Sequence, residues 1–262
     1  MNQNLSSTTP ELLVEQRDAV LWLTINREER RNAMSHAVLA AMAQAIAAAQ
    51  GDRSIRAIVI TGVGSKAFCA GADLQSAKAF TTDYSEPHGH LANLFRVARA
   101  SCIPLIARVN GACMAGGMGL MSMCDMAVAA RHAIFGLPEV RVGVFPAQVL
   151  SVLQHLIPRR TLNERCLTGE PITSAQALEV GLVNYVDDDV DAKLQWLLAR
   201  MLDKSPAAIR RGLYTLKGAE SMAFEQAMAF TESQIALFTL TDDAKEGQKA
   251  FQEKRKPNWA GQ

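Results

Sequence analysis

NGACMAGGMGLMSMCD, residues 110–125, is the stretch from which the organisation of the chain follows. The apolar run before it, at 103–109, predicts a buried strand, and the Met- and Leu-rich segment after its glycines predicts a buried helix. Such a turn exposes free backbone N–H groups at the positive end of a helix dipole, and glycines let a ligand approach them closely. Close packing of a helix on a sheet also favours small residues, so this stretch alone leaves a ligand site and a packing role equally open.

A second glycine-rich turn follows another predicted buried strand. Residues 55–61 (IRAIVIT) are apolar apart from Arg56 and Thr61, and they lead into GVGSKAFCAGADL at 62–74. Two such turns can aim two backbone N–H groups at one oxygen, which is the arrangement of an oxyanion hole. A thioester carbonyl held in this way enolises more easily because negative charge gathers on its oxygen. Loss of one such donor typically costs roughly 3 kcal/mol of transition-state stabilisation.

Composition limits the classes of protein to which the chain can belong. It has 262 residues, 49% hydrophobic and 20% charged, which suits one large α/β domain. A net charge of +1 argues against nucleic-acid and membrane-surface partners. The five cysteines are odd in number and lack CxxC spacing, so we expect reduced thiols in a cytoplasmic protein. The polar N-terminus shows no secretory signal, and no apolar run is long enough to span a bilayer.

Strands and helices alternate along most of the chain, and its end is helical. The alternation predicts stacked ββα units. Ser35 is expected to cap the first long helix, and Thr173 or Ser174 a later one. The predicted strands and helices are a hairpin at 12–25, strands at 126–130 and 133–135, and helices at 37–49, 91–100, 116–124, 147–156, 190–203, 206–216, 223–238 and 242–253.

Three blocks of the sequence carry a resemblance to a known family. They are FCAGADL at 68–74, NGACMAGGMGL at 110–120 and FGLPEVRVGVFP at 135–146. In this order and spacing they resemble the signature blocks of the crotonase (enoyl-CoA hydratase/isomerase) superfamily, over nearly the whole chain. The resemblance implies an α/β crotonase-like fold. Repeated ββα units would form a spiral core over 1–190, and 191–262 would form a helical C-terminal trimerisation region.

The same resemblance implies roles for individual residues. The oxyanion donors would be the amides of Ala70 and Gly116, and Glu139 would transfer protons. Coenzyme A is part of the substrate, so neither a separate cofactor nor a metal is implied. Apart from the family, the sequence favours a surface glutamate or a partner of Arg141 for Glu139, and a solvated surface cation for Arg31. The expected substrate-binding residues are Arg31, Ala33, Ala70, Gly71, Ala72, Asp73, Leu74, Gly116 and Gly119.

Gly119 departs from the family pattern. Hydratases of this family usually carry two glutamates, and Gly119 stands where the first is expected, whereas Glu139 matches the second. One carboxylate can hydrate a 2-enoyl thioester if a single water both attacks and is relayed. It suits even better the shift of a double bond from 3-enoyl to 2-enoyl, because one base with a raised pKa can move the proton. We also expect Gly119 to open space for a larger or branched acyl chain.

These observations predict an enoyl-CoA hydratase acting on an acyl-CoA thioester. The alternatives are an enoyl-CoA isomerase and a catalytically inactive protein that binds CoA thioesters. The polar, irregular segment at 75–90 is expected to form a mobile lid over the acyl pocket. The resemblance further implies a homotrimer or a dimer of trimers, and the apolar run at 223–238 is compatible with this assembly.

Overall fold

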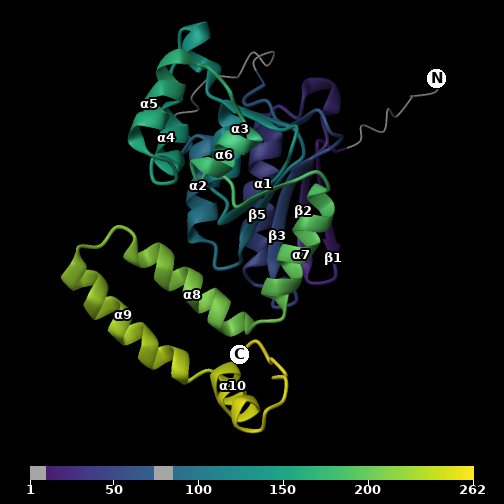
Figure 1. Cartoon of the computed structure of the whole chain (residues 1–262). Coiled ribbons are helices and arrows are strands. Elements are labelled where there is room, and N and C mark those ends of the chain that lie inside the picture. The colour runs from purple at the N-terminus through teal and green to yellow at the C-terminus, as the bar shows by residue number, and fades with distance from the viewer. Residues whose placement is uncertain (1–9, 74–84) are drawn as a thin grey trace.

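The computed structural model describes residues 10–73 and 85–262 (Figure 1). The predicted lid segment at 75–90 therefore lies largely outside the described residues, and Leu74 lies wholly outside them. The strands are β1 (Leu12–Arg17), β2 (Val20–Ile25), β3 (Ala57–Gly62), β4 (Ala67–Cys69), β5 (Leu105–Val109), β6 (Ala112–Met114), β7 (Met126–Ala130), β8 (Ile134–Gly136), β9 (Ile172–Thr173) and β10 (Tyr185–Asp187). The α-helices are α1 (His36–Ala49), α2 (His90–Ala100), α3 (Gly116–Ser122), α4 (Ala147–Leu153), α5 (Arg159–Thr168), α6 (Ser174–Glu179), α7 (Val190–Leu202), α8 (Pro206–Ala219), α9 (Phe224–Thr239) and α10 (Asp242–Gln252). Two 3-10 helices are η1 (Glu28–Arg30) and η2 (Pro138–Val142).

The strands form a larger and a smaller sheet. The larger has six strands in the order β1-β2-β3-β5-β7-β10, parallel except for the β1–β2 hairpin. The smaller has the order β4-β6-β8-β9, in which β4, β6 and β8 are parallel and β9 is antiparallel to β8. The expected alternation of strands and helices is confirmed. The strands β4 and β6 lie inside segments that we had predicted to be turns, and α5 was not predicted either.

The centre of the larger sheet is buried on both faces. Along β3, Ile58 and Ile60 join the hydrophobic core shared with α1, α2 and α3, while Ala57 and Val59 join a second cluster on the opposite face. All four are fully buried. A strand covered on both sides needs an uninterrupted apolar run, which is why residues 57–60 are so apolar.

Helix α7 covers the second face of the larger sheet. Val190, Leu194 and Leu197 of this helix belong to the same hydrophobic cluster as the sheet residues Val59 and Val128. The predicted division at 190/191 therefore separates α7 from the sheet on which it packs. The segment that extends from the body begins with α8.

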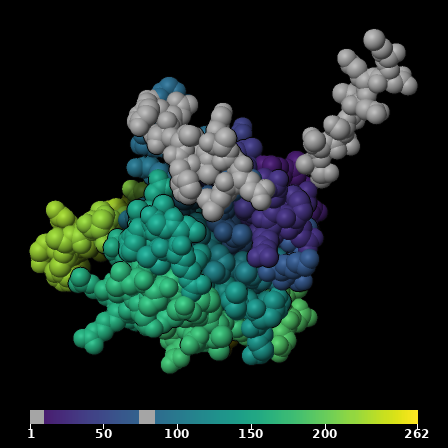
Figure 2. All heavy atoms as spheres, turned by 90° about the horizontal axis from the view of Figure 1, so that it is seen from above, coloured from purple at the N-terminus to yellow at the C-terminus, as the bar shows by residue number. Residues whose placement is uncertain are grey.

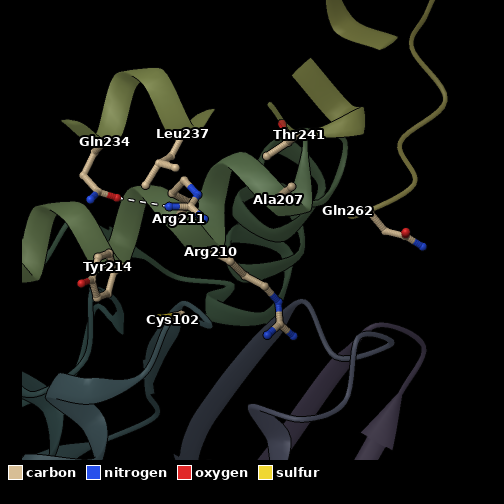
Figure 3. A pocket seen from close by; sticks show the side chains of 9 residues that line it. All are labelled: Cys102, Ala207, Arg210, Arg211, Tyr214, Gln234, Leu237, Thr241 and Gln262. Atoms are coloured by element: carbon tan, nitrogen blue, oxygen red, sulfur yellow. Dashed lines mark hydrogen bonds between the residues drawn. The ribbon is translucent and has the colours of Figure 1, made fainter. Parts of the chain in front are cut away.

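The helices α8, α9 and α10 form an arm below the body in Figure 1, and the yellow-green segment that includes α9 projects at the left of Figure 2. In α8, all of which is described, no residue is buried. Polar contacts fasten it instead. The Arg210 guanidinium donates to the carbonyl oxygens of Gln50, Asp52 and Ile55 at 2.9–3.2 Å, and Figure 3 shows this side chain leaving the arm toward the sheet. The Lys217 ammonium lies 2.9 Å from the Asp125 carboxylate.

Two further features concern the predicted surroundings of the protein. Within the described residues, no helix is both long and apolar enough to cross a bilayer. All five cysteines are free thiols.

Candidate active site

Three adjacent parallel strands of the smaller sheet end at the same edge. β6 lies between β4 and β8, with Cys113 paired to both Cys69 and Phe135. Neighbouring strands lie about 4.8 Å apart, so the segments that follow them can surround one small ligand. β4 leads into Ala70–Ala72, β6 into Ala115–Gly116 and β8 into Leu137–Glu139.

Ala72 is an exposed residue, and its amide faces away from the neighbouring chain segment at Met34. Ala72 forms an isolated parallel bridge with Met34. In this bridge the Met34 N–H donates to Gly71 O at 2.8 Å, and the Asp73 N–H donates to Met34 O at 3.1 Å. Because the residues on either side of Ala72 make both bonds, its own N–H points away from Met34. It donates to no residue in the described ranges.

The amide of Gly116 lies on the facing turn. Gly116 is the first residue of α3, so its N–H has no partner within the helix. A Cβ atom added to Gly116 would lie 3.6 Å from the Ala72 nitrogen, and one added to Gly71 would lie 3.1 Å from the Gly116 nitrogen. Gly71 has φ +101, and its added Cβ would lie 2.8 Å from that of Ala115, so only glycine fits this approach. The two turns thus bring two unpartnered amides together.

Ala70, the first expected donor, is engaged elsewhere. Its N–H donates to Arg31 O at 3.1 Å. This bond arises because Arg31 and Asn32 adopt left-handed backbone conformations, with φ of 51° and 56°, which turn the loop after η1 toward β4. The prediction for Ala70 was therefore wrong, and the available amide in this turn is that of Ala72.

Glu139 lies on η2 with one carboxylate oxygen unpaired. The side chain is half-buried, and Oε2 is inaccessible to solvent and has no hydrogen-bond partner in the described part of the chain. Burial raises the pKa of this carboxyl above its ordinary value of 4.5. Arg141, the alternative partner, lies 2.6 Å from Glu170 instead. Glu139 thus has a partly desolvated carboxylate with one unpaired oxygen, as expected of a proton-transfer group.

The space at Gly119 is occupied, which corrects another expectation. Gly119 lies one helical turn after Gly116 and is buried. A Cβ atom added there would lie 2.6 Å from Phe95 Cζ and 3.2 Å from Val149 Cγ2. The absent side chain therefore does not leave an open pocket, because the Phe95 ring lies against the glycine.

Arg27 holds the turn that contains Ala72, and sequence reasoning missed it. Its side chain is almost fully buried and donates to Asp73 Oδ2 at 2.7 Å and to Ala33 O at 2.6 Å. Glu11 contacts its Nε at 2.9 Å. Asp73 and Ala33 are thereby engaged in positioning the loop and the turn. The signal was present in the sequence, since Arg27 is a cation two residues after a buried strand.

Two asparagines fix the approach to β4. Asn32 Nδ2 donates to Ala67 O at 2.7 Å, and Asn110 Nδ2 donates to the same oxygen at 3.2 Å. Both side chains are buried. Arg31, by contrast, is exposed at the rim of the same loop. Within the described ranges, no cluster of three or more His, Cys, Asp or Glu side chains could hold a metal ion.

Comparison with known proteins supplies a family context. The model of the family described as enoyl-CoA hydratase/isomerase matches residues 15–262. A 2,3-dehydroadipyl-CoA hydratase of Escherichia coli (strain K12) is 35% identical over 96% of this chain and 99% of its own length. A crotonyl-CoA hydratase of Syntrophomonas wolfei is 31% identical over 95% and 97%. The crystal structure of an enoyl-CoA hydratase from Mycobacterium smegmatis superimposes with a TM-score of 0.90 at 33% identity, covering 96% of this chain and 99% of the other.

Proposed function

Because this chain belongs to the enoyl-CoA hydratase/isomerase family and is a hydratase-like enzyme, we propose that it adds water to a 2-enoyl-CoA with one acid–base glutamate. Its fold is the crotonase fold of its structural neighbours. The amides of Ala72 and Gly116 would hold the thioester oxygen, and Glu139 would move the proton. The observation that carries the proposal is the pair of unpartnered amides on two facing turns, together with Glu139 and its unpaired carboxylate oxygen in the segment that follows the third of the three adjacent strands.

The proposed reaction uses one water molecule and returns Glu139 to its starting state. The carboxylate takes a proton from water while the water oxygen bonds to C3 of the substrate. The electron pair of the C2–C3 double bond moves toward the thioester, and the amides of Ala72 and Gly116 stabilise the enolate oxygen. Protonated Glu139 then delivers the proton to C2. Its raised pKa suits both steps because it brings the acid and base forms closer in free energy at neutral pH.

Coenzyme A belongs to the substrate in this proposal, so no separate cofactor is required. The exposed Arg31 on the rim of the loop is available for the CoA phosphates. Gly71, Ala72 and Gly116 would contact the thioester end. The free thiols support a cytoplasmic location.

The test is incubation of the purified protein with 2-enoyl-CoA and, separately, 3-enoyl-CoA thioesters. Hydration removes the absorbance of the conjugated thioester and incorporates oxygen from isotopically labelled water into the product. Tight thioester binding without either change would instead support an inactive binding protein. The hydratase proposal would be contradicted if the protein neither bound any 2-enoyl-CoA nor reduced its absorbance.

An isomerase remains the second candidate because of Gly119. A single carboxylate can remove a proton from C2 of a 3-enoyl thioester and return it to C4, without activating water. The contact of Phe95 with Gly119 supports this candidate, because it leaves no room for a second carboxylate at that turn. Appearance of conjugated absorbance from the 3-enoyl substrate, faster than hydration of the 2-enoyl substrate, would favour it.

We also propose a homotrimer or a dimer of trimers. The arm exposes large apolar side chains, which supports burial against other copies of the chain. Phe224 is 71% exposed, Leu240 68% and Phe251 86%. Light scattering at micromolar concentration tests this assembly, and a monomer would contradict it.

A further inference from the structure

Phe95 packs against the face of α3 that carries Gly116, the proposed oxyanion donor, and Gly119. It lies on α2 and is 7% exposed. Its Cζ would lie 2.6 Å, and its Cε1 3.5 Å, from a Cβ atom added to Gly119. Gly119 follows Gly116 by one turn on the same side of α3, so the two residues form one continuous face. The ring therefore closes the face of α3 that starts at the proposed oxyanion donor.

The same ring also lines a large cavity. The cavity has a volume of about 1140 Å³ and lies among α2, the end of α3, α4 and α8. Pockets that hold small ligands are typically about 300–1,000 Å³, so this space is large enough for an extended alkyl chain. Its lining is mixed: the apolar residues Phe95, Met123, Val152, Leu156 and Leu216 lie beside the charged or titratable residues Arg96, Arg99, Asp125, His155, Lys217 and Glu220.

We propose that Phe95 determines the length of acyl chain that the enzyme accepts. This inference rests on the proposed function. The ring ends the acyl pocket at Gly119 and separates it from the cavity, so the favoured substrates are short-chain enoyl thioesters. A smaller side chain at position 95 joins the two spaces and admits long, unbranched apolar chains. Each additional buried methylene then favours binding about fourfold.

The proposed role of Phe95 also depends on the glycine at position 119. Any side chain at position 119 must displace the ring, because no atom can stand 2.6 Å from an aromatic carbon. The glycine and the phenylalanine thus depend on each other. A methyl group at position 119 is expected to be tolerated only when the residue at 95 is smaller.

The experiment is a chain-length profile of kcat/KM for 2-enoyl-CoA thioesters from four to sixteen carbons. Phe95→Ala should raise kcat/KM for the longest substrates about tenfold or more and change it for the four-carbon substrate by less than about threefold. Phe95→Leu keeps more of the core and should give a smaller shift in the same direction. Val152→Ala is the matched control, because it enlarges the cavity at another lining residue while Phe95 remains, and it should leave the profile unchanged.

A second set of variants tests the dependence between the two positions. Gly119→Ala should lower kcat/KM for all chain lengths, and combination with Phe95→Leu should restore it. Melting temperatures identify any variant that fails to fold. If Phe95→Ala fails to fold, the chain-length profile of Phe95→Leu tests the role of Phe95 in its place. An unchanged profile in Phe95→Leu and Phe95→Ala, or a wild-type enzyme that prefers the longest chains, would overturn the role of Phe95. Absence of hydration by the wild type with every substrate would instead reject the proposed function.

Discussion

The two sheets of this protein differ in what they contribute. In the larger sheet, β1, β2 and β3 have six residues each, and β3 is fully buried along its length. In the smaller sheet, β4, β6 and β8 have three residues each, and the segments after them carry exposed or half-buried amides and a carboxylate. The larger sheet holds most of the core, while the smaller one positions the proposed chemistry. Changes at the strand ends of the smaller sheet should therefore alter activity with little loss of stability, and core changes should do the reverse.

Glu139→Gln should give the largest change in activity. The amide is nearly the same size as the carboxylate but cannot accept the proton from water. We expect kcat to fall by about 10²–10⁴-fold, which is the usual contribution of general acid–base catalysis. Steady-state kinetics with the best 2-enoyl-CoA measure this loss, and retention of full turnover would remove Glu139 from the mechanism.

The same variant should keep or gain stability at neutral pH. Burial raises the pKa of Glu139 in the folded state, so the folded protein holds this proton more strongly than the unfolded chain does. The unfolding free energy of the wild type should therefore fall as pH rises from 4.5 through the raised pKa. Glu139→Gln should lack this part of the pH dependence. The acid limb of wild-type kcat/KM should likewise lie above the ordinary glutamate value, because the ionised form is the one that activates water.

Removal of the Ala72 N–H, the donor proposed in place of the Ala70 N–H, should give the next largest loss of kcat. Replacing an alanine by lactic acid turns its amide into an ester, which removes the N–H and also weakens the preceding carbonyl oxygen as an acceptor. At position 72 this change should lower kcat by about 10²–10³-fold, as loss of one oxyanion donor does. At position 70 it removes the hydrogen bond to Arg31 O, so it should cost about 1 kcal/mol of stability and little of kcat.

These two alanines form a matched pair, because the same replacement is made two residues apart in one turn. Kinetics and thermal unfolding of both proteins decide between them. A larger loss of kcat at position 70 than at position 72 would restore the assignment made from the sequence.

The difference between the sheets also explains what the sequence could and could not predict. The strands β2, β3, β5 and β7 come from apolar runs, and all four were predicted. β4 and β6 are too short to show a periodicity and lie among glycines, so they were taken for turns. Gly116 and Glu139 were predicted from the motif blocks, and they lie in the segments that follow β6 and β8, two neighbouring strands.

The engagement of the Ala70 amide and the closure at Gly119 could not be predicted because both depend on distant segments. The Ala70 amide is engaged by Arg31, whose left-handed backbone conformation belongs to a loop almost forty residues earlier in the chain. The ring that covers Gly119 comes from α2, a separate helix. A local pattern contains no information about either contact.

Gly116→Ala should have a smaller effect than loss of a donor. The new Cβ would lie 3.0 Å from Met34 Cε and 3.6 Å from the Ala72 nitrogen, so it narrows the space between the donors without removing either. We expect kcat/KM to fall about tenfold, with a small change in melting temperature. Gly117→Ala is the contrasting variant. Its Cβ would lie 2.3 Å from Cys69 O, a backbone atom, so it should lower stability first.

The smallest expected effect comes from a substitution of isoleucine by valine, made once in each sheet. Ile58→Val removes a buried methylene equivalent from the middle of the larger sheet, where Ile58 is fully buried and lies beside Leu21 and Leu105. It should cost about 0.5–1.5 kcal/mol, which lowers the melting temperature by about 2–4 °C per kcal/mol in a chain of this size. Ile134→Val makes the same change in β8, where the side chain is 41% exposed, and should cost less than about 0.5 kcal/mol. Neither variant touches the unpartnered amides or Glu139, so kcat should stay within about twofold of the wild type for both. Equal losses of stability at the two positions would mean that the smaller sheet also bears the core, and the separation of packing from chemistry would no longer hold.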